Sequence, residues 1–275
     1  MSRDFRQLLD SQWEQGKFLC VGLDSELEKI PEIAQKGSTE ETLLGFNRAI
    51  VDATRDIVGA FKPNIAFYEA HGDEGWSALR STIAYIQAVA PDVPVILDAK
   101  RGDVGNSSAA YADAVFDHLH ADAITINPYL GAEALQPFLD RADKGVFVLC
   151  RTSNGGSGEF QDLKIQDEEL YKVVARHVAS TWNEKQNCGL VAGATYPEEL
   201  KLVREIIGDM PLLIPGIGAQ NGDIGVSVQA AKNGSGAGMI INASRSILFA
   251  SQNADFAEAA RKEAVRIDGA IRAAL

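Results

Sequence analysis

The sequence predicts an α/β protein: a (β/α)8 barrel that forms a single domain over residues 1–275, with an N-terminal helix. Short apolar runs rich in Val and Ile, which lack the alternation of half-exposed strands, are typical of parallel strands covered on both faces. Eight such runs alternate with helical segments over roughly 250 residues, the usual length of this barrel. Polar residues follow nearly every run. A doubly wound open sheet is the competing interpretation, and the count of eight favours the barrel.

The elements follow from their apolar spacing. The first helix is expected at residues 4–15. The predicted strands are the apolar runs, at residues 18–23, 58–61, 95–97, 123–126, 146–150, 189–192, 211–214 and 238–241. The segments with helical periodicity are residues 39–57, 76–89, 109–119, 132–139, 168–183, 197–207, 224–233 and 255–274. Ser107 and Ser108 can cap the helix that is expected to begin at Ala109.

Composition excludes several classes of protein. The chain has 26 basic and 38 acidic residues, a net charge of −12, which argues against partners such as nucleic acid and anionic membrane surfaces. Its three cysteines, Cys20, Cys150 and Cys188, lie in or beside apolar runs and are expected in the core. No stretch approaches about 18 consecutive apolar residues and no signal-peptide core is present, so we expect no membrane span and a cytoplasmic location.

Charged residues directly follow the apolar run of the third predicted strand. Asp98 and Lys100 are two residues apart, a spacing that puts both side chains on one face of a strand, and Asp103 follows in a glycine-rich turn. Unpaired buried charge is unfavourable, so these groups are expected to pair with one another. A structural ion pair is one interpretation. Three charges at one strand end favour a functional site.

Other strands also end in polar residues, and active sites of this barrel form at the C-terminal strand ends. The further candidates for substrate binding there are Asp24, Lys62, Asn64, Asn127 and Ser153. The last two loops of such barrels commonly bind phosphate, and here they contribute Gly216, Gly218, Gln220 and Arg245. Glycines let backbone N–H groups approach an anion, and an arginine can bind phosphate oxygens with two hydrogen bonds.

The pattern of charges indicates proton chemistry. Lys62, Asp98, Lys100 and Asp103 alternate in sign, and one pair at about 4 Å contributes about 4 kcal/mol at an effective dielectric constant near 20. Such a network keeps Lys100 protonated and fixed, so that it can stabilise a carbanion and then protonate it. No His/Asp/Glu set has metal-binding spacing. Mg²⁺ between the two aspartates would compete with Lys100, and the flanking acids disfavour a Schiff base.

Several motifs resemble one known family. The matching segments, in order along the chain, are residues 21–24 (VGLD), 61–64 (FKPN), 97–107 (LDAKRGDVGNS), 127–131 (NPYLG), 151–154 (RTSN), 215–220 (PGIGAQ) and 244–246 (SRS). Together they resemble the orotidine 5′-phosphate decarboxylases, in the longer-chain bacterial branch. The segment from residue 97 is specific to this family, whereas the glycine loop alone would not be.

The resemblance implies a decarboxylase, without a metal or other cofactor, that converts orotidine 5′-monophosphate (OMP) to uridine 5′-monophosphate (UMP) in pyrimidine synthesis. By the family's pattern, Asp98 lies beside the substrate carboxylate and Lys100 protonates carbon 6 of the pyrimidine. Lys62 and Asp24 contact the ribose, and Ser153 hydrogen-bonds the pyrimidine.

The family's pattern also assigns the phosphate contacts and a dimer. Gln220 lies on a closing loop and reaches the phosphate, while Arg245 binds it directly. Asp103 and Ser107 are contributed across the interface of a homodimer, so that each site is completed by the neighbouring subunit. Ser107 departs from the family's usual threonine, as Val104 departs from isoleucine, and the link after Asn154 is longer than the family core needs.

Two alternatives remain at the level of sequence. One is a metal-dependent decarboxylase or aldolase that acts on a sugar phosphate in a similar barrel. The other is a barrel that binds a phosphosugar without turnover. The set of alternating charges counts against the second, because binding alone does not require Lys100 between two acids.

Overall fold

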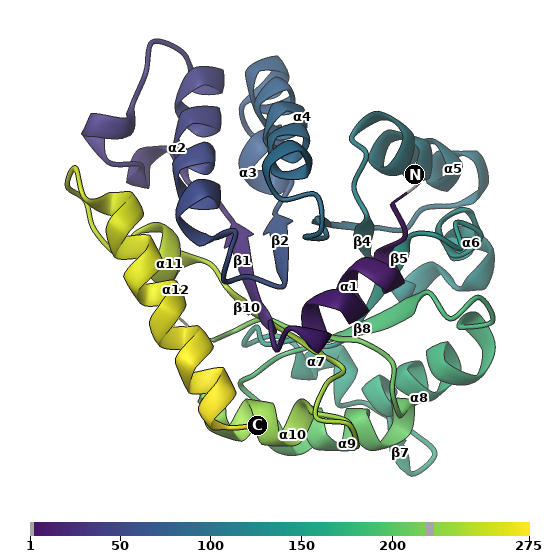
Figure 1. The fold of residues 1–275 in the computed structure, drawn as a ribbon. Helices are drawn as coiled ribbons and strands as arrows, with labels where there is room; N and C mark the ends of the chain where they lie inside the picture. The colour runs from purple at the N-terminus through teal and green to yellow at the C-terminus, as the bar shows by residue number, and fades with distance from the viewer. Residues whose placement is uncertain (1–2, 218–222) are drawn as a thin grey trace.

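A closed barrel of parallel strands forms the centre of the computed structural model, which describes residues 3–217 and 223–275 (Figure 1). Its eight strands are β1 (Leu19–Leu23), β2 (Ala60–Pro63), β3 (Ile96–Arg101), β4 (Ala123–Ile126), β5 (Gly145–Arg151), β8 (Cys188–Ala192), β9 (Leu212–Ile214) and β10 (Met239–Ala243). They pair in the order β2-β1-β10-β9-β8-β5-β4-β3. Parallel bridges from Phe61 to Val95 and from Asn64 to Asp98 join β2 to β3 and close the ring. The predicted (β/α)8 barrel is therefore confirmed.

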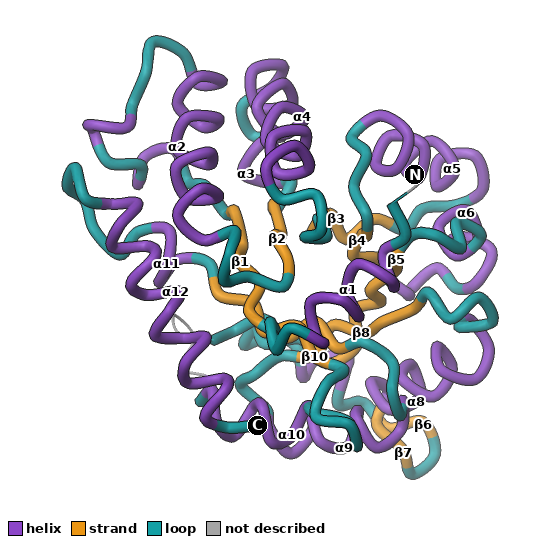
Figure 2. Tube along the Cα trace, in the orientation of Figure 1, coloured by secondary structure: helices purple, strands orange, loops and turns teal. Residues whose placement is uncertain are grey.

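Helices surround the strands, as the tube in Figure 2 shows. They are α1 (Phe5–Glu14), α2 (Thr39–Thr54), α3 (Ala66–Glu69), α4 (Gly72–Val89), α5 (Gly105–Asp113), α6 (Ala132–Leu139), α7 (Gly158–Gln161), α8 (Leu170–His177), α9 (Pro197–Ile207), α10 (Ile224–Ala231), α11 (Arg245–Leu248) and α12 (Phe256–Ala273). No helix in these two described ranges combines the length and the apolar character needed to cross a bilayer.

The N-terminal helix covers one end of the barrel. In Figure 1, α1 lies across the strands. Its contacts include Gly145 and Met239, the first residues of β5 and β10, so it lies at the N-terminal ends of the strands. The Phe5 ring meets Phe147 edge to face with centroids 5.6 Å apart, and Trp13 Nε1 donates to the carbonyl of Met239 at 2.9 Å. A Cβ at Gly145 would lie 2.4 Å from the Phe5 ring, so glycine is required there. Because α1 covers this end, only the C-terminal end of the barrel is left to form a site.

The core consists of the strands themselves. Every residue of β1, β2, β4, β8, β9 and β10 is buried, as parallel strands between two layers should be. The three cysteines are buried and free, as expected. Burial raises the pKa of the Cys20 thiol to about 12, so this group is an inert part of the core.

Three predicted helices begin at clearly different residues in the structure, and the first of them, α4, begins at Gly72 rather than at residue 76. The segment 168–183 begins with a short antiparallel hairpin, β6 (Lys164–Ile165) with β7 (Glu168–Glu169), and α8 begins only at Leu170. The helix predicted to begin at Ala109 begins at Gly105, and no side chain caps it. Ser108 instead accepts the backbone N–H of Asp103 at 3.2 Å, so this serine closes the preceding turn rather than capping the helix.

Candidate active site

The C-terminal end of the barrel holds a cavity of about 420 Å³. Its lining comes from six strands and the segments that follow them: Lys62, Asp98, Lys100, Thr125, Leu149, Thr152, Ser153, Asn154, Gln161, Val191, Leu213 and Pro215. Three of the four residues with predicted catalytic roles are among these. The cavity is charged on the side of β2 and β3, whereas the side of β5, β8 and β9 combines apolar and uncharged polar residues.

A chain of alternating charges occupies the charged side. Lys62 Nζ lies 3.2 Å from Asp98 Oδ2 and 3.6 Å from Asp24 Oδ1. Lys100 Nζ lies 2.6 Å from the other oxygen of Asp98, Oδ1. The Lys62 side chain is only 4% exposed and that of Lys100 is 51% exposed. Lys62 is therefore a fixed, buried charge in the cavity wall, whereas Lys100 is more exposed to a bound molecule.

These ion pairs keep the buried groups charged. Burial alone would raise the pKa of the Asp98 carboxyl, but the ammonium groups of Lys62 and Lys100 hold that pKa well below its usual range. Burial alone would lower the pKa of Lys62, but Asp24 and Asp98 raise it above its ordinary value. Across the neutral range Asp98 is therefore ionised and Lys62 is protonated.

The geometry at Lys100 is not that of a regular strand. Leu97 pairs with Ile124 on β4 and Arg101 pairs with Ile126, so residues 98–100 bulge opposite Thr125 alone. Lys100 has φ +48°, a left-handed conformation that is strained for a side chain other than glycine. The predicted pairing of Asp98 with Lys100 is present, but a bulge produces it instead of simple alternation.

Asp103 and Ser107 lie beyond the strand and do not join this network within one chain. Asp103 Oδ1 accepts the N–H of Val104 at 2.7 Å, and none of the ion pairs among the described residues includes Asp103. Ser107 is exposed on α5. The predicted series of four charges is therefore completed within the chain by Asp24, on the far side of Lys62.

The two candidate asparagines have local partners. Asn64 Oδ1 accepts the N–H of Ala66 at 3.2 Å and so fixes the turn before α3. Asn127 Oδ1 accepts the N–H of Tyr129 at 3.1 Å. Asn127 is exposed and lines a neighbouring apolar cavity of about 590 Å³, which lies outside the charged one.

Two glycines allow the close packing that positions two other candidates, Ser153 and Arg245. A Cβ at Gly193, just after β8, would lie 2.6 Å from the Cβ of Ser153, so glycine there lets the end of β5 present Ser153 to the cavity. A Cβ at Gly22 on β1 would lie 1.9 Å from Ser244 Oγ. Gly22 thus lets the turn before Arg245, the first residue of α11, lie directly against β1 beside Asp24.

The predicted phosphate loops are described in part. Gly216 has φ +101°, which requires glycine, and Arg245 is exposed at the start of α11. Gly218 and Gln220 lie outside the described residues. No group of three His, Cys, Asp or Glu side chains that could hold a metal ion occurs within residues 3–217 and 223–275.

Sequence reasoning missed two polar residues of the cavity wall, Thr125 and Gln161. Thr125 is a buried hydroxyl in the apolar β4, and that contrast is the signal that could have identified it. Gln161, at the end of α7, accepts the N–H of Thr152 with Oε1 at 2.9 Å and donates from Nε2 to Thr152 Oγ1 at 2.8 Å. The link after Asn154 therefore folds back over β5 and contributes to the cavity.

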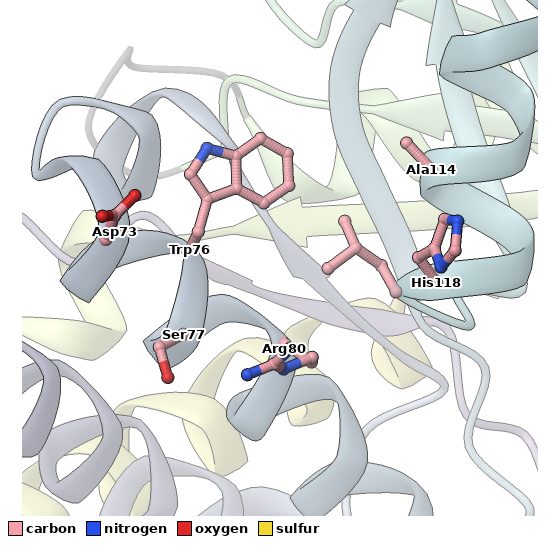
Figure 3. A pocket seen from close by; sticks show the side chains of 7 residues that line it. Asp73, Trp76, Ser77, Arg80, Ala114 and His118 are labelled. Carbon is pink, nitrogen blue, oxygen red and sulfur yellow. The ribbon is translucent and has the colours of Figure 1, made fainter.

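A separate hollow on the outer layer does not share these features. Figure 3 shows it between α4 and the helical segment that contains Ala114 and His118. It has a volume of about 330 Å³ and includes Trp76 and Arg80 of α4. None of the residues that line it follows the C-terminal end of a strand, so it is not the candidate active site.

Comparison with known proteins identifies relatives of this chain. A family model described as orotidine 5′-phosphate decarboxylase / HUMPS family matches residues 17–262. Orotidine 5′-phosphate decarboxylase from Ralstonia pickettii is 49% identical over 262 residues, 95% of each chain. The enzyme of the same name from Herpetosiphon aurantiacus is 51% identical over 247 residues, 90% of this chain and 89% of that one.

A solved structure agrees with the sequence relatives. The structure of Leishmania donovani OMP decarboxylase superposes with a TM-score of 0.84 at 38% identity, covering 98% of this chain and 99% of that one. The matches extend over the whole barrel and include the strand ends that carry the charged residues. The chain belongs to the orotidine 5′-phosphate decarboxylase family.

Proposed function

We propose that the charged side of the cavity decarboxylates orotidine 5′-monophosphate, with Lys100 as the proton donor and Asp98, Lys62 and Asp103 as its charged partners. The reaction, OMP to UMP and CO2 in pyrimidine biosynthesis, follows from membership of the family. The observation that carries the residue assignment is the position of Asp98 between a buried and a half-exposed ammonium group. The protein acts in the cytoplasm.

The substrate lies with its base over the charged residues and its phosphate at the last two loops. Arg245 and the loop with Gly216, Gly218 and Gln220 bind the phosphate, because an arginine and backbone N–H groups are suited to an anion. The ribose lies by Asp24 and Lys62. Asp24 Oδ1 supports this placement, since it is buried and has no hydrogen-bond donor among the described residues. Ser153 and Asn64 complete the pocket around the base and sugar, whereas the predicted contact from Asn127 would come from the neighbouring cavity.

The chemical step needs no redox partner. The bond between carbon 6 and the carboxylate breaks, its electron pair stays on carbon 6, and CO2 leaves. The Lys100 ammonium stabilises this developing negative charge and then gives its proton to carbon 6. The resulting amine regains a proton from water. Asp98 faces the substrate carboxylate, and the repulsion between the two ends when CO2 departs.

Asp103 and Ser107 act in the site of a second copy of the chain. Both lie on the segment after β3 and neither is engaged with Lys100 of its own chain. Exposed apolar side chains near this segment support a homodimer there: Val104, Tyr111, Tyr129 and Leu130.

The loss of OMP absorbance on incubation with purified protein tests the activity. Turnover by the wild type that persists in EDTA is expected, and it excludes the metal-dependent decarboxylase or aldolase. UMP binding without any turnover would instead support the phosphosugar-binding alternative. A wild-type chain that neither turns over OMP nor binds UMP would contradict the proposal.

Mixing two inactive variants tests the shared site. A dimer of one Lys100→Ala chain and one Asp103→Ala chain contains one intact site if Asp103 acts across the interface. Random exchange should then restore about a quarter of wild-type activity, because half of the dimers are mixed and each has one intact site of two. A mixture that stays inactive after demonstrated exchange would show that Asp103 acts within its own chain.

A further inference from the structure

Thr125 is a polar side chain in the middle of an apolar strand. It lies on β4 between Ile124 and Ile126, is 1% exposed, and borders the cavity beside Asp98. A buried hydroxyl without hydrogen bonds is unfavourable, and isoleucine or valine would suit this strand equally well. The hydroxyl therefore needs a specific explanation.

The hydroxyl makes three hydrogen bonds, all to the segment that carries the proposed chemistry. Thr125 Oγ1 accepts the backbone N–H groups of Ala99 and Lys100, each at 3.0 Å. It also lies 2.8 Å from Asp98 Oδ1. Two N–H donors already fill the acceptor positions of the hydroxyl, so its own proton points to the Asp98 carboxylate. The direction of all three bonds is thereby fixed.

These bonds replace those that the β-bulge removes. Residues 98–100 stand opposite Thr125 alone, so the N–H groups of Ala99 and Lys100 have no regular partner on β4. The Thr125 hydroxyl accepts both, and this supports the left-handed conformation of Lys100 at φ +48°. The same hydroxyl shares Asp98 Oδ1 with Lys100 Nζ. One oxygen atom thus fixes both the backbone beneath the lysine and the carboxylate that holds its ammonium group.

We propose that Thr125 is a positioning residue for the decarboxylation: its hydroxyl holds the Lys100 ammonium and the Asp98 carboxylate in their reactive arrangement. The inference rests on the proposed function, since it assigns to Thr125 the geometry of the proton donor named there. Thr125 acts through Lys100 and Asp98. It should therefore affect the chemical step more than the binding of the nucleotide, whose phosphate is held elsewhere.

The test compares Thr125→Val with Thr125→Ser. Valine has nearly the same shape and removes the three hydrogen bonds, whereas serine keeps the hydroxyl. Thr125→Val should lower kcat about 10- to 100-fold and change KM for OMP less than about 3-fold. Thr125→Ser should keep kcat within about 3-fold of the wild type. The dissociation constant of UMP, measured by calorimetry, should change little in either variant.

A buried threonine elsewhere provides the matched control. Thr54 on α2 is fully buried, and its hydroxyl donates to the Ile50 carbonyl at 2.8 Å. Thr54→Val removes a buried hydroxyl far from the strand ends and should leave kcat unchanged even where it lowers the melting temperature. If Thr125→Val does not fold, Thr125→Ala, which leaves room for water, replaces it in the comparison and should show the same loss of kcat.

Three outcomes would overturn the inference. They are an unchanged kcat in Thr125→Val, an equal loss of kcat in Thr125→Ser, and a loss in Thr125→Val that appears mainly in KM. A failure of the proposed function is distinguishable from all three, because the wild type and the Thr54→Val control would then show no turnover either.

Discussion

The two ends of the substrate site are built differently. At the charged end, Asp98 accepts from Lys62 on β2, Thr125 on β4 and Lys100 on its own strand, β3. At the phosphate end, Arg245 is exposed, and none of the ion pairs among the described residues involves it. The charged end is thus assembled before substrate arrives, whereas the described residues do not hold Arg245 in the same way.

This difference predicts that the charged end contributes mainly to the chemical step and the phosphate end mainly to substrate binding. Preorganised charges reduce the reorganisation needed in the transition state, so changes at the charged end should appear in kcat and in stability. An arginine that is exposed without substrate contributes through binding, so changes at the phosphate end should appear mainly in KM. Four variants, taken from the largest expected effect to the smallest, test this distinction.

Lys100→Ala removes the proton donor and should give the largest effect. We expect kcat to fall at least about 10³-fold, since both proton transfer and electrostatic stabilisation are lost. Lys100→Arg should not restore it, because the guanidinium keeps the charge but does not release a proton near neutral pH. Calorimetry should show that UMP still binds. Equal turnover in wild type and Lys100→Ala would refute the assignment of the proton donor.

Asp98→Asn tests the stability of the charged end. Removal of one partner from a buried ion pair should lower the free energy of unfolding by about 3 kcal/mol at pH 7. The pKa of Asp98 is lower in the folded chain than in the unfolded one, where it is about 3.9. The carboxylate therefore contributes stability above about pH 4 and loses it as pH falls through the folded-state pKa. Urea unfolding should show that the difference in free energy of unfolding between the wild type and Asp98→Asn becomes smaller below pH 4. If this difference in free energy of unfolding stays constant from pH 7 to pH 3, the ionised Asp98 carboxylate is not the source of the lost stability.

Arg245→Ala tests the phosphate end. Charge-assisted hydrogen bonds to a phosphate are worth about 1.5–3 kcal/mol, so KM for OMP should rise about 10- to 100-fold. The effect on kcat should be smaller. Arg266→Ala is a suitable control, because Arg266 lies on α12 and pairs with Glu263, three residues away on the same helix. A fall in kcat with KM unchanged would show that the two ends do not differ as proposed.

The barrel and the charged strand end were predictable because both depend on local pattern. Apolar runs of about three to six residues predicted the buried strands, and the spacing of two predicted that Asp98 pairs with Lys100, although a bulge brings the two side chains together. The connection between Lys62 and Asp24 was not predictable. It requires β1 and β2 to lie side by side at a register that pairs Gly22 with Lys62, and neither residue's neighbours in sequence specify that register.

The misplaced elements have similar causes. Residues 168–183 are amphipathic throughout, so periodicity alone does not show that Glu168 and Glu169 pair with residues 164–165 in a hairpin. Gly155 to Gly158 is typical of a flexible loop, yet α7 follows directly and Gln161 returns to Thr152, a contact between residues nine positions apart. Thr125 was not predicted because its hydrogen-bond partners lie on another strand. The bulge leaves the N–H groups of Ala99 and Lys100 without regular partners on β4, and for that reason a hydroxyl is needed there.

Gln161→Leu should give the smallest effect, because Gln161 acts between the two ends. Its amide holds Thr152 by two neutral hydrogen bonds next to Ser153, the proposed contact of the base. Since each such bond contributes about 1 kcal/mol, KM for OMP should rise about 3- to 10-fold with kcat nearly unchanged. Gln136→Leu is the matched control, because the Gln136 amide on α6 donates to the exposed Asp140 on the outer layer. A fall in kcat that exceeds the rise in KM would show that Gln161 belongs to the charged end. The preorganised part of the site would then extend beyond β5.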